Sequence, residues 1–525
     1  MRSKTGIFTI VLRKVRVMIY GYAALGFQGE LVQIEVDLRR GIPGIDIIGL
    51  ANQAVQEARD RVRVALRRAG FALWEGRILL SLAPADLRKN GGGYDLALAL
   101  AILEAMGQWK SLDFPLLALG ELSLEGNLRP VAGVLGAALL AREQGIKHLL
   151  VPAQQAAEAG SVPGIMVFPI EHLSQLSQIY EQICQGNPPP SHHAQSPKKE
   201  AHLPFMARGP QVRPLTIAAA GGHHLLLVGP PGTGKTVAAR SLASLLPPPT
   251  PQEEIDINRI ASLMGEWRAE DGWIQARPVR FVSPGATREG LCGGADLRPG
   301  EVTRSHAGLL ILDETLEFSS SVLQSLRHPT QEGEVYIVRS GRSFRFPARF
   351  QLVLTTNPCP CGRYGLPQST CYCSVAEIHQ YWKTLSGPLL DRIDLRFWCS
   401  PLSVNELSRK NEVSVDQLRG NVHRAHQIQR SRNPNQKLNA HLNIDEIHQV
   451  LNLDGKVVEK WISCGQRWGL SGRSSLGLLK VMRTLADLEE LEAPTVYHLE
   501  EALRLRLYGE LGWGREHLDI NFKFG

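Results

Sequence analysis

The segment at 229–236 constrains the fold of this chain more than any other. It matches the pattern G-x-x-x-x-G-K-[ST], follows an apolar run at 225–228 and precedes helix-forming residues at 237–246. This order predicts a phosphate-binding loop, because its glycines let backbone N–H groups at a helix start approach negative charge. We therefore expect an α/β fold that binds a nucleoside triphosphate through Gly229, Pro230, Pro231, Gly232, Thr233, Gly234, Lys235 and Thr236.

Polar residues that follow further apolar runs predict hydrolysis of that nucleotide. The run at 308–312 ends in Asp313 and Glu314, and the run at 350–356 ends at Asn357. Buried parallel strands read as continuous aliphatic runs, and ligands bind beyond their carboxyl ends. We expect Asp313 and Thr236 to hold Mg²⁺, Glu314 to polarise the attacking water and Asn357 to orient it. Arg392 is the candidate arginine finger, a residue that a neighbouring subunit often supplies.

This order of motifs resembles the AAA+ ATPases, and within them the magnesium-chelatase-like ComM/YifB family. The motifs that carry the resemblance lie at 217–236, 298–301, 357–362 and 385–394, with others at 35–38, 49–50, 82–89, 470–473 and 483–488. The resemblance implies an AAA+ P-loop core with a helical lid, preceded by an α+β Lon-protease-like domain of the ribosomal S5 domain 2 type. It also implies ATP and Mg²⁺ as cofactors. By the same resemblance Arg473 is the sensor-2 arginine, which reaches back from the lid to the γ-phosphate.

The chain departs from the family pattern at three places. A His-His pair is usual where this chain has 280–284, and Leu-Pro is usual where it has Thr315 and Leu316. The aspartate-led entry to the ATPase module is blurred at 203–209. None of these departures removes a residue with an expected role in ATP chemistry, but they concern loops on the substrate side.

Changes in composition and proline-rich breaks divide the chain into regions. We predict a Lon-like N-terminal domain at 18–185, a linker at 186–204 that is rich in proline and polar residues, an ATPase core at 205–400 and a helical lid at 401–525. Family-like sequence begins just after Met18, so residues 1–17 are a candidate non-native extension. Their short apolar stretch has no small-residue cleavage site after it, which argues against export.

The remaining composition favours a cytoplasmic protein with no membrane contact. No window of about 18 uncharged apolar residues occurs. The net charge of +7 is compatible with a polyanionic partner, although the charges are spread along the chain. Gly93 stands where Lon-type proteases carry their nucleophilic serine. Because nucleophilic catalysis needs an activated hydroxyl, we expect no protease activity.

Four of the eight cysteines form two pairs, Cys359 with Cys361 and Cys371 with Cys373. Two such pairs joined by one loop suit a closed tetrahedral zinc site. The one-residue gap is tighter than the common spacing, so free thiols remain the alternative. Either way, the place of this loop between Asn357 and Arg392 gives it an architectural role.

The segment at 334–347 predicts a hairpin, because its residues alternate on either side of a Ser-Gly turn. It precedes the strand that ends at Asn357, which is the position of a pore-facing hairpin in this branch of AAA+ proteins. Arginines interleaved with aromatic residues suit phosphate contacts and base stacking. The candidate DNA contacts are Arg339, Arg342 and Arg345, and a solvated edge hairpin is the alternative.

The sequence thus favours an ATP-hydrolysing AAA+ motor that forms a homo-oligomeric ring, expected to be a hexamer. The family resemblance implies action on branched or single-stranded DNA, as in branch migration during recombination and natural transformation. Two alternatives stay open. One is a protein-remodelling chaperone like the MoxR relatives, and the other is a magnesium-chelatase ATPase subunit, which the N-terminal domain disfavours.

Overall fold

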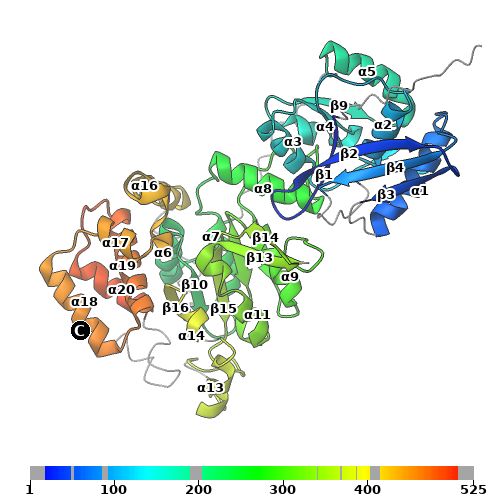
Figure 1. Cartoon of the computed structure of the whole chain (residues 1–525). Helices are drawn as coiled ribbons and strands as arrows, with labels where there is room; N and C mark the ends of the chain where they lie inside the picture. The colour runs from blue at the N-terminus through cyan, green and yellow to red at the C-terminus, as the bar shows by residue number, and fades with distance from the viewer. Residues whose placement is uncertain are drawn as a thin grey trace, which may run out of the picture. The chain divides into compact units, whose positions relative to one another are not determined.

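The computed structural model of the chain describes residues 18–48, 53–84, 93–189, 204–339, 341–366, 369–385, 387–401 and 414–506. By their internal contacts they divide into two units (Figure 1), one drawn from 1–198 and 261–273 and one from 199–260 and 274–525. The candidate extension at 1–17, most of the predicted linker and the family-like segments at 49–50 and 85–89 lie outside the described residues. None of the described helices is long and apolar enough to cross a membrane.

The first unit is built on one mixed sheet of seven strands in the order β3-β4-β2-β1-β5-β8-β9. Antiparallel pairing joins β1 to β2 and β2 to β4, and the remaining neighbours are parallel. The strands are β1 (Ile19–Ala23), β2 (Glu30–Arg39), β3 (Gly44–Ile48), β4 (Arg77–Ala83), β5 (Leu116–Ala118), β8 (His148–Pro152) and β9 (Met166–Ile170). A separate short ribbon pairs β6 (Glu121–Leu122) with β7 (Leu128–Arg129).

The helices of this unit are α1 (Gln53–Arg68), α2 (Asp95–Ala105), α3 (Val134–Glu143), α4 (Ala156–Gly160) and α5 (Leu176–Gln185). Every residue of α2 from Asp95 to Glu104 is buried, as its nearly continuous apolar sequence requires. The Asp95 carboxylate accepts hydrogen bonds from Arg61 at 2.9 and 3.2 Å. Burial raises the pKa of Asp95 to about 6 although Arg61 opposes the shift. Gly93 lies two residues before this helix and presents no side chain there.

The second unit contains a five-stranded parallel sheet in the order β11-β12-β15-β10-β16. Its strands are β10 (Leu225–Val228), β11 (Val279–Val282), β12 (Leu309–Leu312), β15 (Gln351–Thr356) and β16 (Leu395–Trp398). All residues of β10, β12 and β15 are buried, which agrees with the continuous apolar runs that predict these strands. The strand that leads into the P-loop is an interior strand of the sheet, beside β15.

The connections of the core carry α6 (Val212–Gly221), α7 (Lys235–Ala243), α8 (Pro251–Met264), α9 (Arg288–Cys292), α10 (Glu301–Arg304), α11 (Ser320–Ser325), α12 (Pro329–Glu332), α13 (Val375–Trp382) and α14 (Gly387–Leu390). The boundary between the two units runs through α8. The predicted hairpin forms from β13 (Glu334–Arg339) and β14 (Arg342–Pro347), with Ser340 of its turn outside the described residues.

The C-terminal part is helical, with α16 (Val415–Arg432), α17 (Ile444–Val450), α18 (Gly455–Trp468), α19 (Gly472–Leu488) and α20 (Val496–Arg506). Figure 1 shows α17 to α20, in orange and red, gathered on one side of the core. One continuous hydrophobic cluster includes Leu225 and Val353 of the sheet together with Leu478 and Leu499 of these helices. The five-stranded sheet and the C-terminal helices therefore form a single unit by contacts.

Candidate functional site

The P-loop connects β10 to α7 and is shaped by its glycines. Gly232 and Gly234 have φ values of 81° and 80°, a conformation that side chains other than glycine rarely adopt. A Cβ atom at Gly229 would lie 2.3 Å from the carbonyl oxygen of Cys399, so the adjacent strand leaves no room there. The Thr233 hydroxyl donates to the Pro230 carbonyl at 2.9 Å. The loop is thus held in one shape before any ligand contact is considered.

Lys235 lies at the centre of this loop. Its Nζ donates to the carbonyl oxygens of Gly229 at 2.6 Å and Pro230 at 2.9 Å, and to Asn357 Oδ1 at 3.2 Å. Burial lowers the pKa of Lys235, against the nearby Asp313 and Glu314 carboxylates, which raise it. The structure therefore brings Asn357, which follows β15, to the lysine that follows β10.

Asp313 follows β12 and meets the first turn of α7. The Thr236 hydroxyl lies 3.1 Å from both carboxylate oxygens of Asp313, and the Thr355 hydroxyl also donates to this carboxylate. A hydroxyl and a carboxylate side by side are the oxygen ligands that Mg²⁺ takes beside phosphates. The residues present fit a nucleotide-bound magnesium ion.

Glu314 has an unusual backbone conformation and an exposed side chain. Its φ of 52° and ψ of 48° are left-handed, and its N–H donates to the Thr355 hydroxyl at 3.3 Å. Such a conformation costs a residue with a Cβ atom roughly 1 kcal/mol or more, and is common at functional sites. The strand end thus turns so that Asp313 points toward α7 while Glu314 remains accessible.

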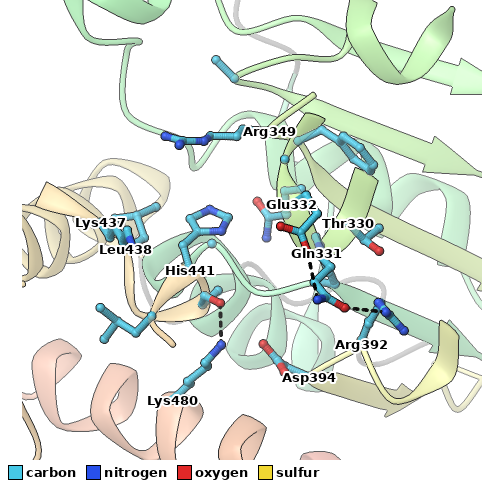
Figure 2. Close-up of a pocket in the computed structure, with 18 of the residues that line it drawn as sticks. Thr330, Gln331, Glu332, Arg349, Arg392, Asp394, Lys437, Leu438, His441 and Lys480 are labelled. Carbon is cyan, nitrogen blue, oxygen red and sulfur yellow. Dashed lines mark hydrogen bonds between the residues drawn. The ribbon is translucent and has the colours of Figure 1, made fainter. Parts of the chain in front are cut away.

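A second candidate site is a cavity at the opposite ends of these parallel strands, where the strands begin. A cavity of about 660 Å³ is lined there by His224 before β10, Gly308 before β12, Gln351 at the start of β15 and Asp394 before β16. The C-terminal helices close its other side (Figure 2). Seven of its lining residues are Arg or Lys and four are Asp or Glu, so the cavity carries net positive charge.

Arg392 and Arg473 both reach this cavity. Arg392 Nη2 donates to Gln331 Oε1 at 2.6 Å, and Arg473 Nη2 donates to the same oxygen at 3.2 Å. Burial lowers the pKa of the Arg392 guanidinium, and the charges of Arg473 and Arg327 lower it further. Figure 2 shows Arg392 pointing toward Gln331. The structure brings the two predicted arginines together, but not with the P-loop.

The position of Arg473 differs from the expectation that it reaches back to the γ-phosphate. Within the part of the chain that the structure describes, no hydrogen bond or ion pair joins Arg473 to 229–236. The reason is the packing of α19. Its Thr484 bonds at 2.8 Å to His223, which lies two residues before the start of β10. This contact ties the helix to the edge of the sheet where the strands begin.

Asp394 strengthens the same attachment. It accepts a hydrogen bond from His223 Nδ1 at 2.8 Å and lies 3.8 Å from the Arg506 guanidinium of α20. Burial by itself would raise the pKa of Asp394, but the hydrogen bond from His223 and the charges of His223, Lys480 and Arg506 lower it to about 2. Asp394 is therefore ionised in the folded protein at neutral pH.

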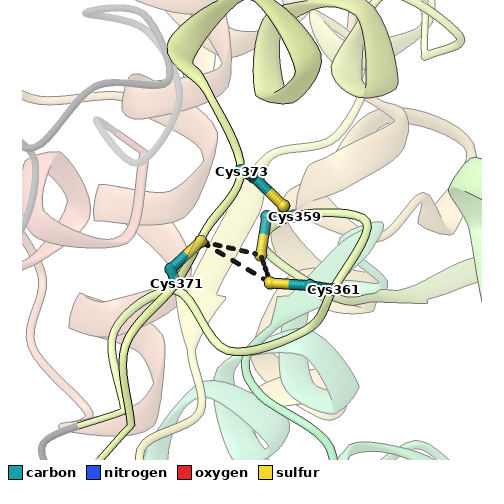
Figure 3. A group of neighbouring side chains, drawn as sticks. All are labelled: Cys359, Cys361, Cys371 and Cys373. Atoms are coloured by element: carbon teal, nitrogen blue, oxygen red, sulfur yellow. Dashed lines mark hydrogen bonds between the residues drawn. The ribbon is translucent and has the colours of Figure 1, made fainter.

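The four paired cysteines converge, as Figure 3 shows. Their sulfur atoms all lie within 4.8 Å of one another. The Sγ of Cys359 lies 3.4 Å from that of Cys361 and 3.6 Å from that of Cys371. Four thiolates at about 2.3 Å from one zinc ion would be separated by similar distances. The geometry is compatible with a closed four-cysteine zinc site.

This cysteine loop contacts the P-loop. Gly362 packs so closely on Pro231 of the P-loop that a Cβ atom would lie 2.9 Å from the proline ring. Trp382 in α13 donates to the Pro358 carbonyl at 3.0 Å. Tyr381 donates to Glu317 at 3.0 Å, just beyond Glu314. The loop therefore supports the P-loop and the segment that carries Asn357.

The hairpin does not present its three arginines on one face. Arg339 is paired with Arg342, and Tyr336 is paired with Arg345. Opposite residues of an antiparallel pair share a face, so Arg339 and Arg342 lie together at the turn and Arg345 lies on the other face. Arg345 pairs with Glu334, which also accepts from Tyr336 at 2.7 Å. Arg339 Nη1 is buried with no hydrogen-bond partner among the described residues.

Two departures from the family pattern have local partners. Arg280, in the segment at 280–284 where a His-His pair is usual, donates to Glu301 at 2.6 and 3.0 Å. Thr315 is buried, and its hydroxyl donates to the Leu312 carbonyl at 3.0 Å. Both side chains thus stabilise the second unit.

Three site residues escape sequence reasoning. Gln211 donates to the Thr233 carbonyl at 2.8 Å, Thr355 binds Asp313, and Gln331 joins Arg392 to Arg473. Thr355 could have been noticed as a hydroxyl at the end of an apolar run. The two glutamines lie in ordinary polar segments and have no local signal.

Three family profiles match the chain in succession. Residues 34–155 match subunit ChlI of Mg-chelatase, 207–407 match magnesium chelatase, subunit ChlI, and 412–506 match the C-terminal region of that subunit. The match at 207–407 contains the P-loop, both strand ends and the hairpin.

Similar proteins cover nearly the whole chain. An uncharacterized protein of Mycobacterium tuberculosis is 38% identical over 93% of this chain and 98% of its own length. The YifB protein of Salmonella typhimurium is 36% identical over 94% of this chain and 97% of its own. The competence protein ComM of Haemophilus influenzae is 38% identical over 93% and 97%.

Proposed function

The chain belongs to the ComM/YifB family of magnesium-chelatase-like AAA+ proteins, and from this premise we propose that it is an ATP-hydrolysing, ring-forming motor that acts on DNA. The observation that carries the proposal is the meeting of Lys235, Thr236, Asp313 and Asn357 at one edge of the sheet. Each of these contacts joins residues that follow different strands, so one ligand can touch all of them.

The proposed hydrolytic roles follow from these positions. Lys235 binds the β- and γ-phosphates of ATP. Thr236 and Asp313 would hold Mg²⁺, which neutralises charge between those phosphates when bound. Glu314 is exposed beside them and polarises the attacking water, and Asn357 orients it. Because Glu314 and Asn357 act on the water, removal of the Glu314 carboxylate should leave the phosphate contacts of Lys235 intact.

The positions of Arg392 and Arg473, at the ends where the strands begin, support assembly into a ring. Arg392 and Arg473 lie where the strands begin, whereas the P-loop lies where they end. Strand β10 alone separates the two edges by about 13 Å, at about 3.3 Å per residue. We propose that both arginines contact the nucleotide of a neighbouring copy, so that each site is complete only in a homo-oligomer, expected to be hexameric.

The hairpin supports DNA as the substrate. Arg339 and Arg342 lie opposite each other at its turn and share one face of the ribbon. Two guanidinium groups on one face suit contact with a nucleic-acid backbone phosphate. The name of the ComM relative, a competence protein, points to the same class of substrate.

The cysteine loop adds a structural zinc ion to the proposal. Cys359, Cys361, Cys371 and Cys373 would hold it, and its effect would be to fix the loop that supports Pro231 and Asn357.

The decisive experiment measures ATP turnover by the full-length protein alone, with forked or four-way DNA, and with unfolded polypeptide. A DNA motor shows stimulation by branched DNA. Stimulation by polypeptide instead would favour the remodelling-chaperone alternative. ATP turnover that neither branched DNA nor unfolded polypeptide changes would favour the chelatase alternative. The names of the family profiles keep that alternative open.

A further inference from the structure

Gln331 occupies a position that the hydrolytic roles above do not use. It lies in α12, and its Oε1 accepts from Arg392 and from Arg473 at once. Its Nε2 donates to Glu332 at 2.9 Å, an arrangement consistent with the oxygen facing the arginines. A single amide oxygen thus joins a residue before β16 to the first turn of α19.

The two guanidinium groups repel each other, and Gln331 holds them together without removing their charge. Arg392 is also held by the Pro388 carbonyl through Nη1 at 2.5 Å, another neutral acceptor. The positive charge of Arg327 also lowers the pKa of Arg392, while the negative charges of Asp391 and Glu332 raise it. Neutral acceptors fix the direction of a cation and leave its charge available, whereas a carboxylate at hydrogen-bond distance forms a competing ion pair.

We propose that Gln331 is a positioning residue, which presents Arg392 and Arg473 as one doubly charged clamp for the terminal phosphate of a neighbouring subunit's nucleotide. This inference rests on the proposed function. Two arginines aimed at one phosphate stabilise the negative charge that spreads over its oxygens during transfer. A neutral bridge leaves the positive charge of both arginines to the phosphate, whereas a carboxylate in the same place would neutralise part of that charge.

The test compares Gln331→Glu and Gln331→Ala with the parent and with Gln324→Glu. Gln324 is an exposed residue of α11 that bonds Ser320, so its variant adds the same charge on a nearby helix. We expect Gln331→Glu to lower kcat by about tenfold or more with KM for ATP nearly unchanged. Gln331→Ala should lose less, because the arginines keep their charge, and Gln324→Glu should match the parent.

Binding of ADP with aluminium fluoride, which mimics the transferring phosphate, provides a second readout. Gln331→Glu should weaken it and leave the binding of ADP alone unchanged, a difference that loss of folding would not produce. Subunits carrying Gln331→Glu mixed with Lys235→Ala subunits should recover turnover, since each supplies what the other lacks.

The results for Arg392→Ala and for the Gln331 variants distinguish the role of Gln331 from the proposed role of the arginines. If Arg392→Ala abolishes turnover but both Gln331 variants match the parent in kcat and in aluminium fluoride binding, Gln331 has no positioning role and only the inference falls. If Arg392→Ala keeps parental turnover, the arginine clamp itself is refuted and the inference falls with it.

Discussion

Lys235 Nζ donates a hydrogen bond of 3.2 Å to Asn357 Oδ1. The two residues follow neighbouring parallel strands, in which Val228 of β10 is paired with Thr356 of β15. The lysine proposed to bind phosphate and the residue proposed to orient water are therefore in contact at the carboxyl ends of these strands. A ligand that draws Lys235 toward its phosphates also leaves the Asn357 amide free to bind water.

Separate substitutions should divide nucleotide binding from hydrolysis. Lys235→Ala should abolish ATP binding, because the phosphates lose their point charge. Glu314→Gln should bind ATP and stall, since it removes only the water-activating carboxylate. Fluorescent-nucleotide titration and phosphate release measure the two steps. Parental hydrolysis by Glu314→Gln would show that another residue activates water.

Mixing experiments should reveal whether Arg392 acts across a subunit interface. Arg392→Ala alone should bind ATP and lose turnover by roughly 10³-fold or more. Adding Lys235→Ala subunits should restore part of it, because an intact P-loop then meets an intact arginine. Subunit exchange must be verified by labelled chains. Mixed rings that stay inactive despite exchange would place the arginine's role within its own chain.

The hairpin arginines should differ in their effect on DNA binding. Arg339→Ala with Arg342→Ala should lower the slope of log affinity against log salt by about two units, one for each lost phosphate contact. Arg345→Ala should change it less, because Glu334 already pairs with Arg345 on the other face. Labelled forked DNA titrated at several salt concentrations measures the slopes, with basal ATP turnover as the folding control. Equal slopes for parent and double variant would remove the turn from the DNA path.

Removal of metal should weaken the nucleotide site. We expect about one zinc ion per chain, lost in Cys359→Ser and retained in Cys184→Ser, whose cysteine lies in α5. Loss of zinc should lower ATP turnover, because the loop contacts Pro231 and carries the residues after Asn357. Metal analysis and a chelator titration of the ATPase rate test this. Parent protein that contains no metal, with four freely reactive thiols in the loop, would favour free cysteines.

The attachment of the C-terminal helices should depend on pH through Asp394. Its pKa in the folded protein is about 2, below the usual value of about 3.9 in an unfolded chain. The unfolded chain therefore binds the proton more readily, so this carboxylate stabilises the fold above about pH 4 and ceases to do so as the pH falls toward 2. Urea unfolding of parent and Asp394→Asn should show a difference at pH 7 that shrinks below pH 4. A difference that stays constant across that range would mean that the ionised carboxylate contributes nothing.

Local sequence patterns predict one edge of the sheet well. Continuous aliphatic runs identify β10, β12 and β15, and the polar residues after them meet because parallel strands end together. Alternation likewise predicts the hairpin. The faces of its arginines follow only once the register pairs Arg339 with Arg342.

The other edge could not be predicted in this way. Arg473 lies beside Gln331 because Thr484 and His223 join α19 to the start of β10, a contact between residues far apart in the sequence. Nothing in the residues around Gln331 marks it as the partner of two arginines. The predicted Lon-like character of the first unit rests on the segment at 89–95, of which 89–92 lies outside the described residues.

The hydrophobic cluster shared by the sheet and the C-terminal helices restricts how the second unit can move internally. A lid that swings open on a hinge must expose the surface beneath it, and exposing about 400 Å² of apolar surface would cost about 10 kcal/mol. That is comparable to the whole stability of many domains. In the proposed ring, movement should therefore come from rigid-body steps between neighbouring subunits, with the second unit of each chain moving as one body. Distances measured between labels on the sheet and on α19 of one chain should stay constant through the ATP cycle.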